Sequence, residues 1–232
     1  MKKYRAKITK LIAHIVKQLK IENDLIPLIS NDSHKYIITQ FESGFFDEIG
    51  WKNSFLTKKP VDKAGNPLPM MSYSMINFFK ERLSKEMSIF EFGSGNSTLF
   101  FSKYVKKIIT VEHDKKWYDY IKNNMPENVQ IIYKELEYGG EYSKTAQKQN
   151  EKFDVILVDG RDRVNCAINS FEKLKESGVI IVDDMFREKY ELLYSFFREK
   201  GFKDLTLSGI SPGQLLEHKT TVFYRQNNDL RI

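Results

Sequence analysis

Apolar and polar positions follow two different periods along this chain, and the switch between them locates the predicted elements. Short apolar runs typical of buried strands occupy residues 87–92, 107–112, 129–133, 153–159 and 179–183. Apolar residues recur every three or four positions, as in amphipathic helices, over 70–84, from 97 onward, and over 115–124, 165–175 and 188–200. Strands that alternate with helices predict right-handed crossovers and a mostly parallel sheet with helices on both faces.

The end of the chain breaks this alternation. Two strand-like runs, 202–207 and 220–225, have no helical pattern between them, so they predict a hairpin that adds an antiparallel strand to the sheet. The predicted fold is therefore α/β: residues 70–232 form a doubly wound, mostly parallel seven-stranded sheet with an antiparallel C-terminal strand.

Residues 1–69 carry a different pattern and are predicted to form a helical and irregular extension. Residues 4–19 have an apolar stripe at helical spacing, and residues 1–20 contain seven Lys or Arg and no acid. Residues 21–69 are punctuated by Gly, Pro and Asn, which favours short helices and loops. We expect the extension to cap a site or to pack against the domain or a second copy of the chain, giving a homodimer. The alternative for its basic helix is weak association with a membrane surface.

Composition narrows the class of protein. With 41% hydrophobic and 29% charged residues the chain is predicted to be globular. It has no apolar run of the roughly 18 residues that a membrane span needs, no secretory signal pattern, and one cysteine, Cys166, so a cytoplasmic location is expected. The net charge of +6 is not arranged as a basic run interleaved with aromatics, so nucleic acid is not the expected partner.

The first run of the predicted sheet ends in a glycine-containing loop, Glu91–Thr98. Gly93 and Gly95 permit a tight turn and close approach of a ligand to the backbone. A lone Gly-x-Gly is a weak signal, but its place between a strand and a helix predicts a ligand-binding loop. The residues of this loop expected to bind a cofactor are Glu91, Gly93, Ser94, Gly95, Asn96 and Ser97.

The second run ends in Glu112-His113-Asp114. Glu112 follows Gly93 by 19 residues, close to the roughly 20 expected for a carboxylate that accepts hydrogen bonds from ribose hydroxyls. His113 is expected against the base of the same nucleoside, or as a structural residue. The other use of these acids is helix capping, and both hold together if Asp114 caps the next helix while Glu112 binds ribose.

Two nucleoside-binding classes compete at this point. A dinucleotide-binding motif places a third glycine three residues after the second, where this chain has Thr98. The loop instead resembles the first motif of class I S-adenosylmethionine-dependent methyltransferases, and the resemblance extends over residues 87–225. It implies S-adenosylmethionine as cofactor, with Glu91 suited to the ammonium and sulfonium groups and Glu112 on the ribose.

The ends of the fourth and fifth strands complete the resemblance. Phe153–Gly160 is similar to the family's fourth-strand motif, whose acid, here Asp159, faces the methyl-transfer site. With Asp183 and Asp184 it would form an oxygen-rich site for Mg²⁺, as in catechol-type and some sugar O-methyltransferases, where a metal binds the acceptor hydroxyls.

The chain departs from that pattern directly after Asp159. Catechol-type enzymes place a lysine base there, whereas this chain has Arg161-Asp162-Arg163. Either Asp162 acts as the base, or the arginines pair with the carboxylates and displace a metal.

The predicted reaction is in-line transfer of a methyl group to a hydroxyl, or as a second choice an amine, of a small molecule or sugar, which leaves S-adenosylhomocysteine. Asp159 and Asp162 are the predicted catalytic residues. One alternative is an NAD-dependent oxidoreductase, which Thr98 disfavours. The other is a non-catalytic nucleoside-binding module, which would need Glu112 but no acidic cluster.

Overall fold

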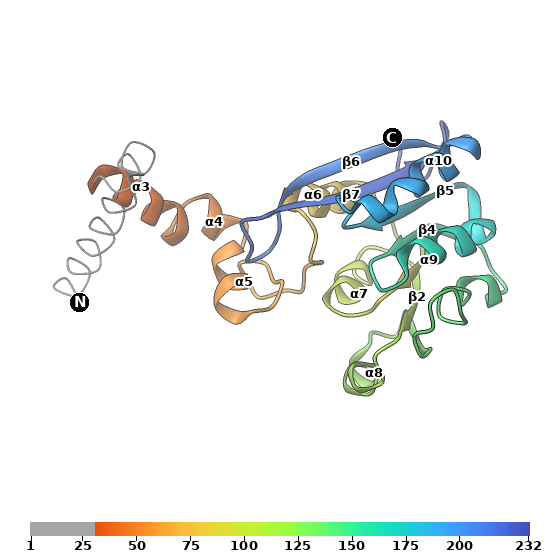
Figure 1. Ribbon diagram of the computed structural model, residues 1–232. Helices are drawn as coiled ribbons and strands as arrows, with labels where there is room; N and C mark the ends of the chain where they lie inside the picture. The colour runs from red at the N-terminus through yellow and green to blue at the C-terminus, as the bar shows by residue number, and fades with distance from the viewer. Residues whose placement is uncertain (1–30) are drawn as a thin grey trace.

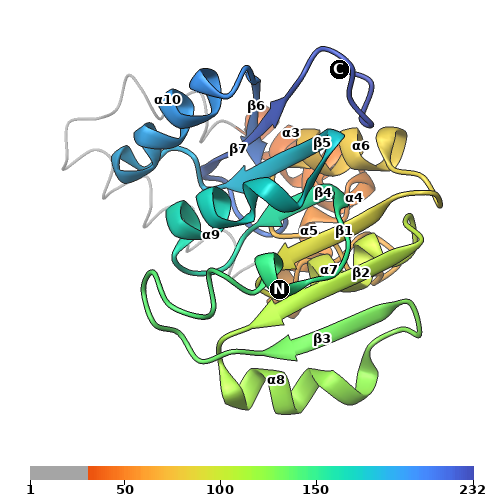
Figure 2. The same cartoon turned by 90° about the vertical axis from the view of Figure 1, so that its right-hand side faces the viewer.

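A computed structural model describes residues 31–232, so the basic amphipathic helix predicted over residues 4–19 lies outside the described residues. The described chain forms one seven-stranded sheet with the strand order β3-β2-β1-β4-β5-β7-β6 (Figure 2). The strands are β1 (Ser88–Phe92), β2 (Lys107–Glu112), β3 (Val129–Tyr133), β4 (Phe153–Val158), β5 (Leu174–Asp183), β6 (Lys203–Ile210) and β7 (Glu217–Tyr224).

Strands β1 to β5 are mutually parallel, and β7 runs antiparallel to both of its neighbours. The chain thus returns at its end to insert β7 between β5 and the edge strand β6. This arrangement confirms the predicted doubly wound α/β fold, including the hairpin at the C-terminus.

Side chains of the central strands alternate between two apolar layers, because successive residues of a strand point to opposite faces. On one face Phe90 and Phe92 pack with helices α9 (Arg163–Ser170) and α10 (Glu191–Glu199). On the other face Ile89 packs with α6 (Tyr73–Arg82) and α7 (Asn96–Phe101). Glu91 points to this second face as well, which carries it beneath the start of α7.

The order of the strands fixes where a ligand can bind. From β1 the chain builds outward through β2 to β3, and then crosses to β4 on the other side of β1. At such a switch point the loops after the two adjacent strands diverge and leave a crevice at the carboxyl edge of the sheet. The loops that follow β1 and β4 therefore frame the expected site, and α8 (Lys115–Ile121) begins beside it.

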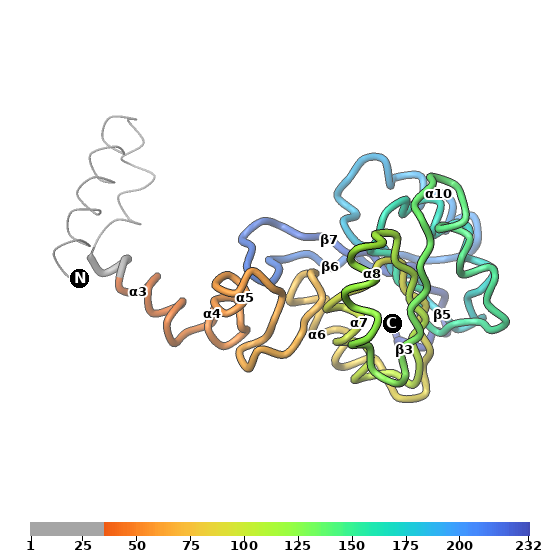
Figure 3. The backbone as a smooth tube through the Cα atoms, turned by 90° about the horizontal axis from the view of Figure 1, so that it is seen from below, coloured from red at the N-terminus to blue at the C-terminus, as the bar shows by residue number. Residues whose placement is uncertain are grey.

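In the part of the extension that the structure describes, residues 31–69, three helices precede α6. These are α3 (Asn31–Glu42), α4 (Phe45–Glu48) and α5 (Trp51–Thr57). Figures 1 and 3 show them leading away from one end of the sheet. The tip of the β6–β7 hairpin reaches α5, where Trp51 Nε1 donates a hydrogen bond to the carbonyl of Gln214 at 2.9 Å.

The helix predicted over residues 165–175 differs most from the structure. The helical pattern over 165–175 ends early: α9 stops at Ser170, a short 3₁₀ turn follows, and β5 already begins at Leu174. Strand pairing overrides the periodicity there, because Leu174 pairs with Phe153 and the ammonium of Lys175 lies 2.8 Å from Asp154 Oδ1. Within residues 31–232 there is no helix long and apolar enough to cross a membrane.

Candidate functional site

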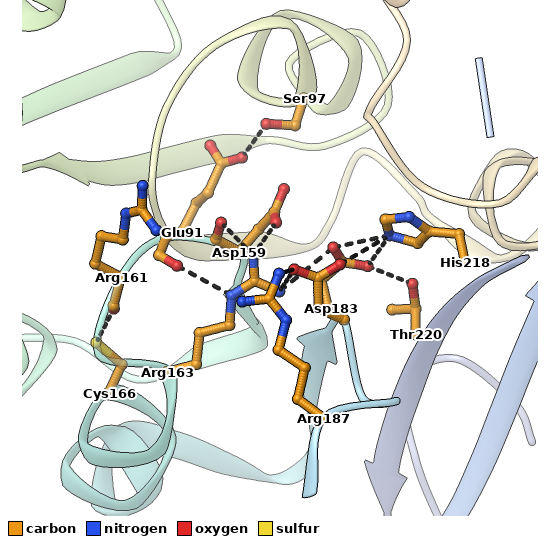
Figure 4. A network of polar contacts seen from close by, with 12 residues as sticks. Glu91, Ser97, Asp159, Arg161, Arg163, Cys166, Asp183, Arg187, His218 and Thr220 are labelled. Carbon is orange, nitrogen blue, oxygen red and sulfur yellow. Dashed lines mark hydrogen bonds and ion pairs between the residues drawn. The ribbon is translucent and has the colours of Figure 1, made fainter. Parts of the chain in front are cut away.

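The loop after β1 is held from below by a buried carboxylate. Glu91 is inaccessible to solvent, and one of its oxygens accepts a hydrogen bond from Ser97 Oγ at 2.6 Å (Figure 4). Its other oxygen accepts from Thr98 Oγ1, also at 2.6 Å. Burial raises its pKa to about 7, although the two hydroxyls partly oppose that rise. Glu91 borders neither of the pockets described below, so it shapes the loop rather than lining the space where a ligand would lie.

The loops after β1 and β4 touch backbone to backbone. Gly93 has a φ of +92°, which an L side chain rarely adopts, and a Cβ added there would lie 3.1 Å from the Cα of Gly160. A Cβ added to Gly160 would overlap the hydroxyl of Tyr142. The two glycines thus let both loops meet at the switch point.

The two acidic residues at the end of β2, Glu112 and Asp114, have different roles. Asp114 caps α8, since its carboxylate accepts from the backbone N–H groups of Lys116 and Trp117. Glu112 turns toward the loop after β1 and accepts from the Ser94 backbone at 3.1 Å and from Ser94 Oγ at 2.8 Å. The ring of His113 lies beside it, with Nδ1 2.9 Å from Glu112 Oε1. Capping by Asp114 leaves Glu112 bordering the pocket.

Two adjoining pockets occupy this edge of the sheet. The first has a volume of about 740 Å³ and runs from Glu112 and His113 to Arg187 and Tyr190. The second has a volume of about 680 Å³ and extends toward Pro60 in the extension. Both volumes are typical of small-ligand sites. Four residues line both pockets: Ser94, Ser97, Trp117 and Asp159.

The residues predicted to bind a cofactor divide between these spaces. Gly93, Glu112 and His113 line the first pocket only, and Gly95 and Asn96 line the second only. Asn96 Nδ2 also donates to the carbonyl of Pro60 at 2.8 Å, so the extension is tied to the loop after β1.

Three carboxylates converge at the ends of β4 and β5, and a guanidinium lies among them (Figure 4). Arg163, at the start of α9, lies 3.2 Å from Asp159 Oδ1, 3.5 Å from Asp183 Oδ2 and 3.2 Å from Asp184 Oδ2. The Arg163 side chain is only 10% exposed. Arg187 adds a second cation, 2.5 Å from Asp184 Oδ2.

The acids of this cluster differ in their affinity for a proton. Burial raises the pKa of Asp159 well above its usual range, and the nearby negative charge of Asp183 adds to the rise. Burial would raise the pKa of Asp183 as well, but the hydrogen bond and charge of His218 outweigh it and lower that pKa. Burial alone would lower the pKa of His218, yet Asp183 raises it. Asp183 and His218 therefore form an ion pair beside a carboxyl group that readily holds a proton.

The predicted magnesium ligands do not fit a metal in this arrangement. Asp159, Asp183 and Asp184 do lie together, but the oxygens that would face an ion already accept from Arg163. Of the two outcomes that the sequence left open, pairing with arginine is the one that the geometry favours, and the partner is Arg163. Arg161 is exposed on the same loop.

Asp162 lines the first pocket, but its carboxylate is engaged. Oδ2 accepts from the Gly139 backbone at 2.7 Å and Oδ1 accepts from Asn165 Nδ2 at 2.8 Å. Its φ of +52° places it at the sharp turn into α9. These contacts give Asp162 a structural task at the turn, and its role as a base stays a prediction.

Some lining residues carried little signal in the sequence. Trp117 is 41% exposed, lines both pockets and donates from Nε1 to the Ser94 carbonyl at 2.9 Å. Its position three residues after the capping Asp114 was the available clue. Tyr138 and Arg187 also line the first pocket and come from irregular segments with no recognisable motif. Lys189 lines it from a short 3₁₀ helix, Glu188–Tyr190.

Comparison with known proteins identifies the domain that contains this site. A family model described as "Methyltransferase domain" matches residues 90–185, which include the loops after β1, β2, β4 and β5. No curated protein matches the sequence. Many solved structures share the fold, with 483 matching chains.

Three of these structures span different activities. The O-methyltransferase TomG of Streptomyces achromogenes, involved in tomaymycin synthesis and solved with S-adenosylmethionine, is 11% identical with a TM-score of 0.51, over 64% of this chain and 77% of that chain. A precorrin-8w decarboxylase of Methanobacterium thermoautotrophicum is 15% identical with a TM-score of 0.50, over 72% and 97%. An rRNA methylase of Streptococcus thermophilus is 14% identical with a TM-score of 0.49, over 65% and 93%. At these identities the likeness is one of fold.

The matched domain, the strand order and the loop after β1 all indicate the same kind of domain. Residues 90–185 of this chain form a methyltransferase domain, and its fold is that of S-adenosylmethionine-dependent methyltransferases.

Proposed function

We propose that this methyltransferase transfers the methyl group of S-adenosylmethionine to a hydroxyl group of a small molecule or sugar. The observation that carries the proposal is the position of Asp159. Its side chain lines both pockets, between Glu112 at one end and Arg187 at the other. Its raised pKa makes its carboxylate a stronger base than an ordinary aspartate, as removal of a hydroxyl proton requires.

In the proposed complex the nucleoside occupies the Glu112 end of the first pocket. Glu112 accepts the ribose hydroxyls, His113 lies beside the base, and the loop from Gly93 to Ser97 runs along the cofactor. This arrangement brings the sulfonium toward Asp159. The acceptor would then enter from the end of the pocket that Arg187 and Tyr190 line.

The reaction needs positioning more than covalent help from the protein. The acceptor oxygen attacks the methyl carbon in line with the C–S bond, and the electron pair of that bond goes to sulfur. The hydroxyl proton passes to the carboxylate of Asp159, and S-adenosylhomocysteine leaves. An amine acceptor would follow the same path, and it remains the second choice.

We also propose that the extension, with its boundary near residue 69, caps the second pocket beside the cofactor loop. Lys58, Lys59 and Pro60 line the second pocket together with Met70, and Asn96 ties the extension to the loop after β1. A segment that lies over the cofactor loop is well placed to shape the space next to it.

The test combines one substitution with a panel of acceptors. Asp159→Asn should leave the affinity for S-adenosylhomocysteine within about threefold but lower methyl transfer roughly 100-fold or more, because it removes the base. Exposed Asp119→Asn on α8 is the matched control. Methyl-labelled cofactor would be offered with hydroxylated small molecules, sugars, amines and RNA. Label found only on an amine or on RNA would refute the proposed acceptor class, as would full activity of Asp159→Asn.

A further inference from the structure

The guanidinium of Arg163 is fully committed to the site. A guanidinium has five N–H donors. Nε donates to the carbonyl of Gly160 at 3.0 Å. Nη2 faces the Asp159 carbonyl and Asp159 Oδ1, both at 3.2 Å, and Nη1 faces Asp183 Oδ2 and Asp184 Oδ2. Five protein oxygens thus surround the group, four as hydrogen-bond acceptors and Asp184 Oδ2 as an ion-pair partner.

These contacts join two strand ends through one charge. Asp159 and Gly160 follow β4, whereas Asp183 is the last residue of β5 and Asp184 follows it. Carboxylates this close repel one another unless a cation or a proton lies between them. A largely buried guanidinium meets that requirement with fixed geometry, since its planar fork matches several carboxylate oxygens at once.

We infer that Arg163 is a built-in cation at the place where catechol-type methyltransferases bind a divalent metal, so that this enzyme holds its catalytic carboxylates without one. The inference concerns the protein's own charges and is independent of the identity of the acceptor. Removal of the Arg163 side chain should leave three carboxylates around a vacated cation position.

A second cluster near this position has side chains that could hold a metal ion. One ligand atom each of Asp183, Asp184 and His218 lie within 4.8 Å of one another. However, His218 Nε2 already lies 2.9 Å from Asp183 Oδ1, and Asp184 Oδ2 is shared by Arg163 and Arg187. An ion there would have to break the His218–Asp183 pair and lie beside the guanidinium groups of Arg163 and Arg187, which argues against a resident metal at this second cluster too.

The experiment measures metal binding without relying on turnover. Thermal unfolding of the full chain is followed with millimolar Mn²⁺ or Mg²⁺ and with EDTA, for the wild type and for Arg163→Gln. The wild type should shift by less than about 1 °C. Arg163→Gln should gain roughly 3–6 °C with Mn²⁺ if the ion is present at about ten times its Kd. Arg161→Gln, on the same loop but with no acidic partner among residues 31–232, is the control and should gain nothing.

Two results would overturn the inference. One is stabilisation of the wild type by Mn²⁺ that EDTA reverses, which would show a resident site despite Arg163. The other is an Arg163→Gln variant that folds but binds no Mn²⁺, because the carboxylates would then not form a cation site at all. If that variant does not fold, Mn²⁺ titration of the wild type followed by electron paramagnetic resonance decides: no bound ion supports the inference and a bound ion refutes it.

Discussion

The substitution Glu91→Gln tests the buried carboxylate under the cofactor loop. Glu91 is inaccessible to solvent, and its pKa is about 7 in the folded protein against an ordinary value of 4.5. The folded state therefore binds this proton more tightly than the unfolded state does. The resulting stabilisation is fully present below pH 4.5 and is lost as the pH rises through 7.

The two pKa values give the size of the effect. Between pH 5 and pH 8 this one group should lower the free energy of unfolding of the wild type by about 2.5 kcal/mol. Glu91→Gln has no proton to lose, so its stability relative to wild type should improve by that amount over the same interval. For a chain of this size the relative Tm should change by about 5–10 °C.

The assay is thermal unfolding at pH 5, 6, 7 and 8 without cofactor, for the wild type, Glu91→Gln and the exposed control Glu86→Gln. A constant offset of Glu91→Gln would reflect altered hydrogen bonds with Ser97 and Thr98, and it cancels in the comparison across pH. The reasoning is refuted if the Tm of Glu91→Gln runs parallel to that of the wild type from pH 5 to pH 8. Glu86→Gln should run parallel.

Three further substitutions test other parts of the site and its support. Glu112→Gln should weaken binding of S-adenosylhomocysteine roughly 10- to 100-fold in calorimetry, since hydrogen bonds to a charged group contribute about 1.5–3 kcal/mol; unchanged affinity would remove Glu112 from the cofactor site. Gly160→Ala should cost about 1–3 kcal/mol in denaturant unfolding through overlap with Tyr142, and Tyr142→Phe in the same chain should recover part of the loss; equal losses would contradict the overlap. Asp154→Asn should destabilise by about 1–3 kcal/mol, because Asp154 accepts from the Ser88 backbone and pairs with Lys175; a variant as stable as wild type would show that these contacts matter little.

The sequence was sufficient for the fold because hydrophobic periodicity and strand order obey simple rules. β2 and β3 have the bounds that their apolar runs predict, and the final hairpin follows from the absence of a helix between its strands. The sequence did not predict that β5 begins at Leu174, because the polar residues Lys175 and Glu176 are more typical of a helix than of a buried strand. Pairing with β4 decides the matter there, and pairing partners cannot be read from one strand alone.

The site was predicted less completely. Residues at strand ends, such as Glu112 and Asp159, were found because a parallel sheet brings the ends together. Arg163 was recognised as an alternative partner for the carboxylates, but its choice over Arg161 depends on the turn at Asp162, whose φ is +52°. Trp117 lines the pockets because of the direction in which α8 runs from its N-cap, Asp114. Such directions arise from tertiary packing, which periodicity does not record.

The hydrogen bond from Asn96 to the carbonyl of Pro60 has a consequence for proteolysis. It joins the cofactor loop to the extension, so a ligand that fixes one also restrains the other, and the coupling must act in both directions. The peptide bond after Lys58 lies two residues from this contact, where φ is +58°. Occupied and empty enzyme should therefore differ in their rate of tryptic cleavage at Lys58, which makes protease sensitivity in the extension a reporter of cofactor occupancy at the sheet.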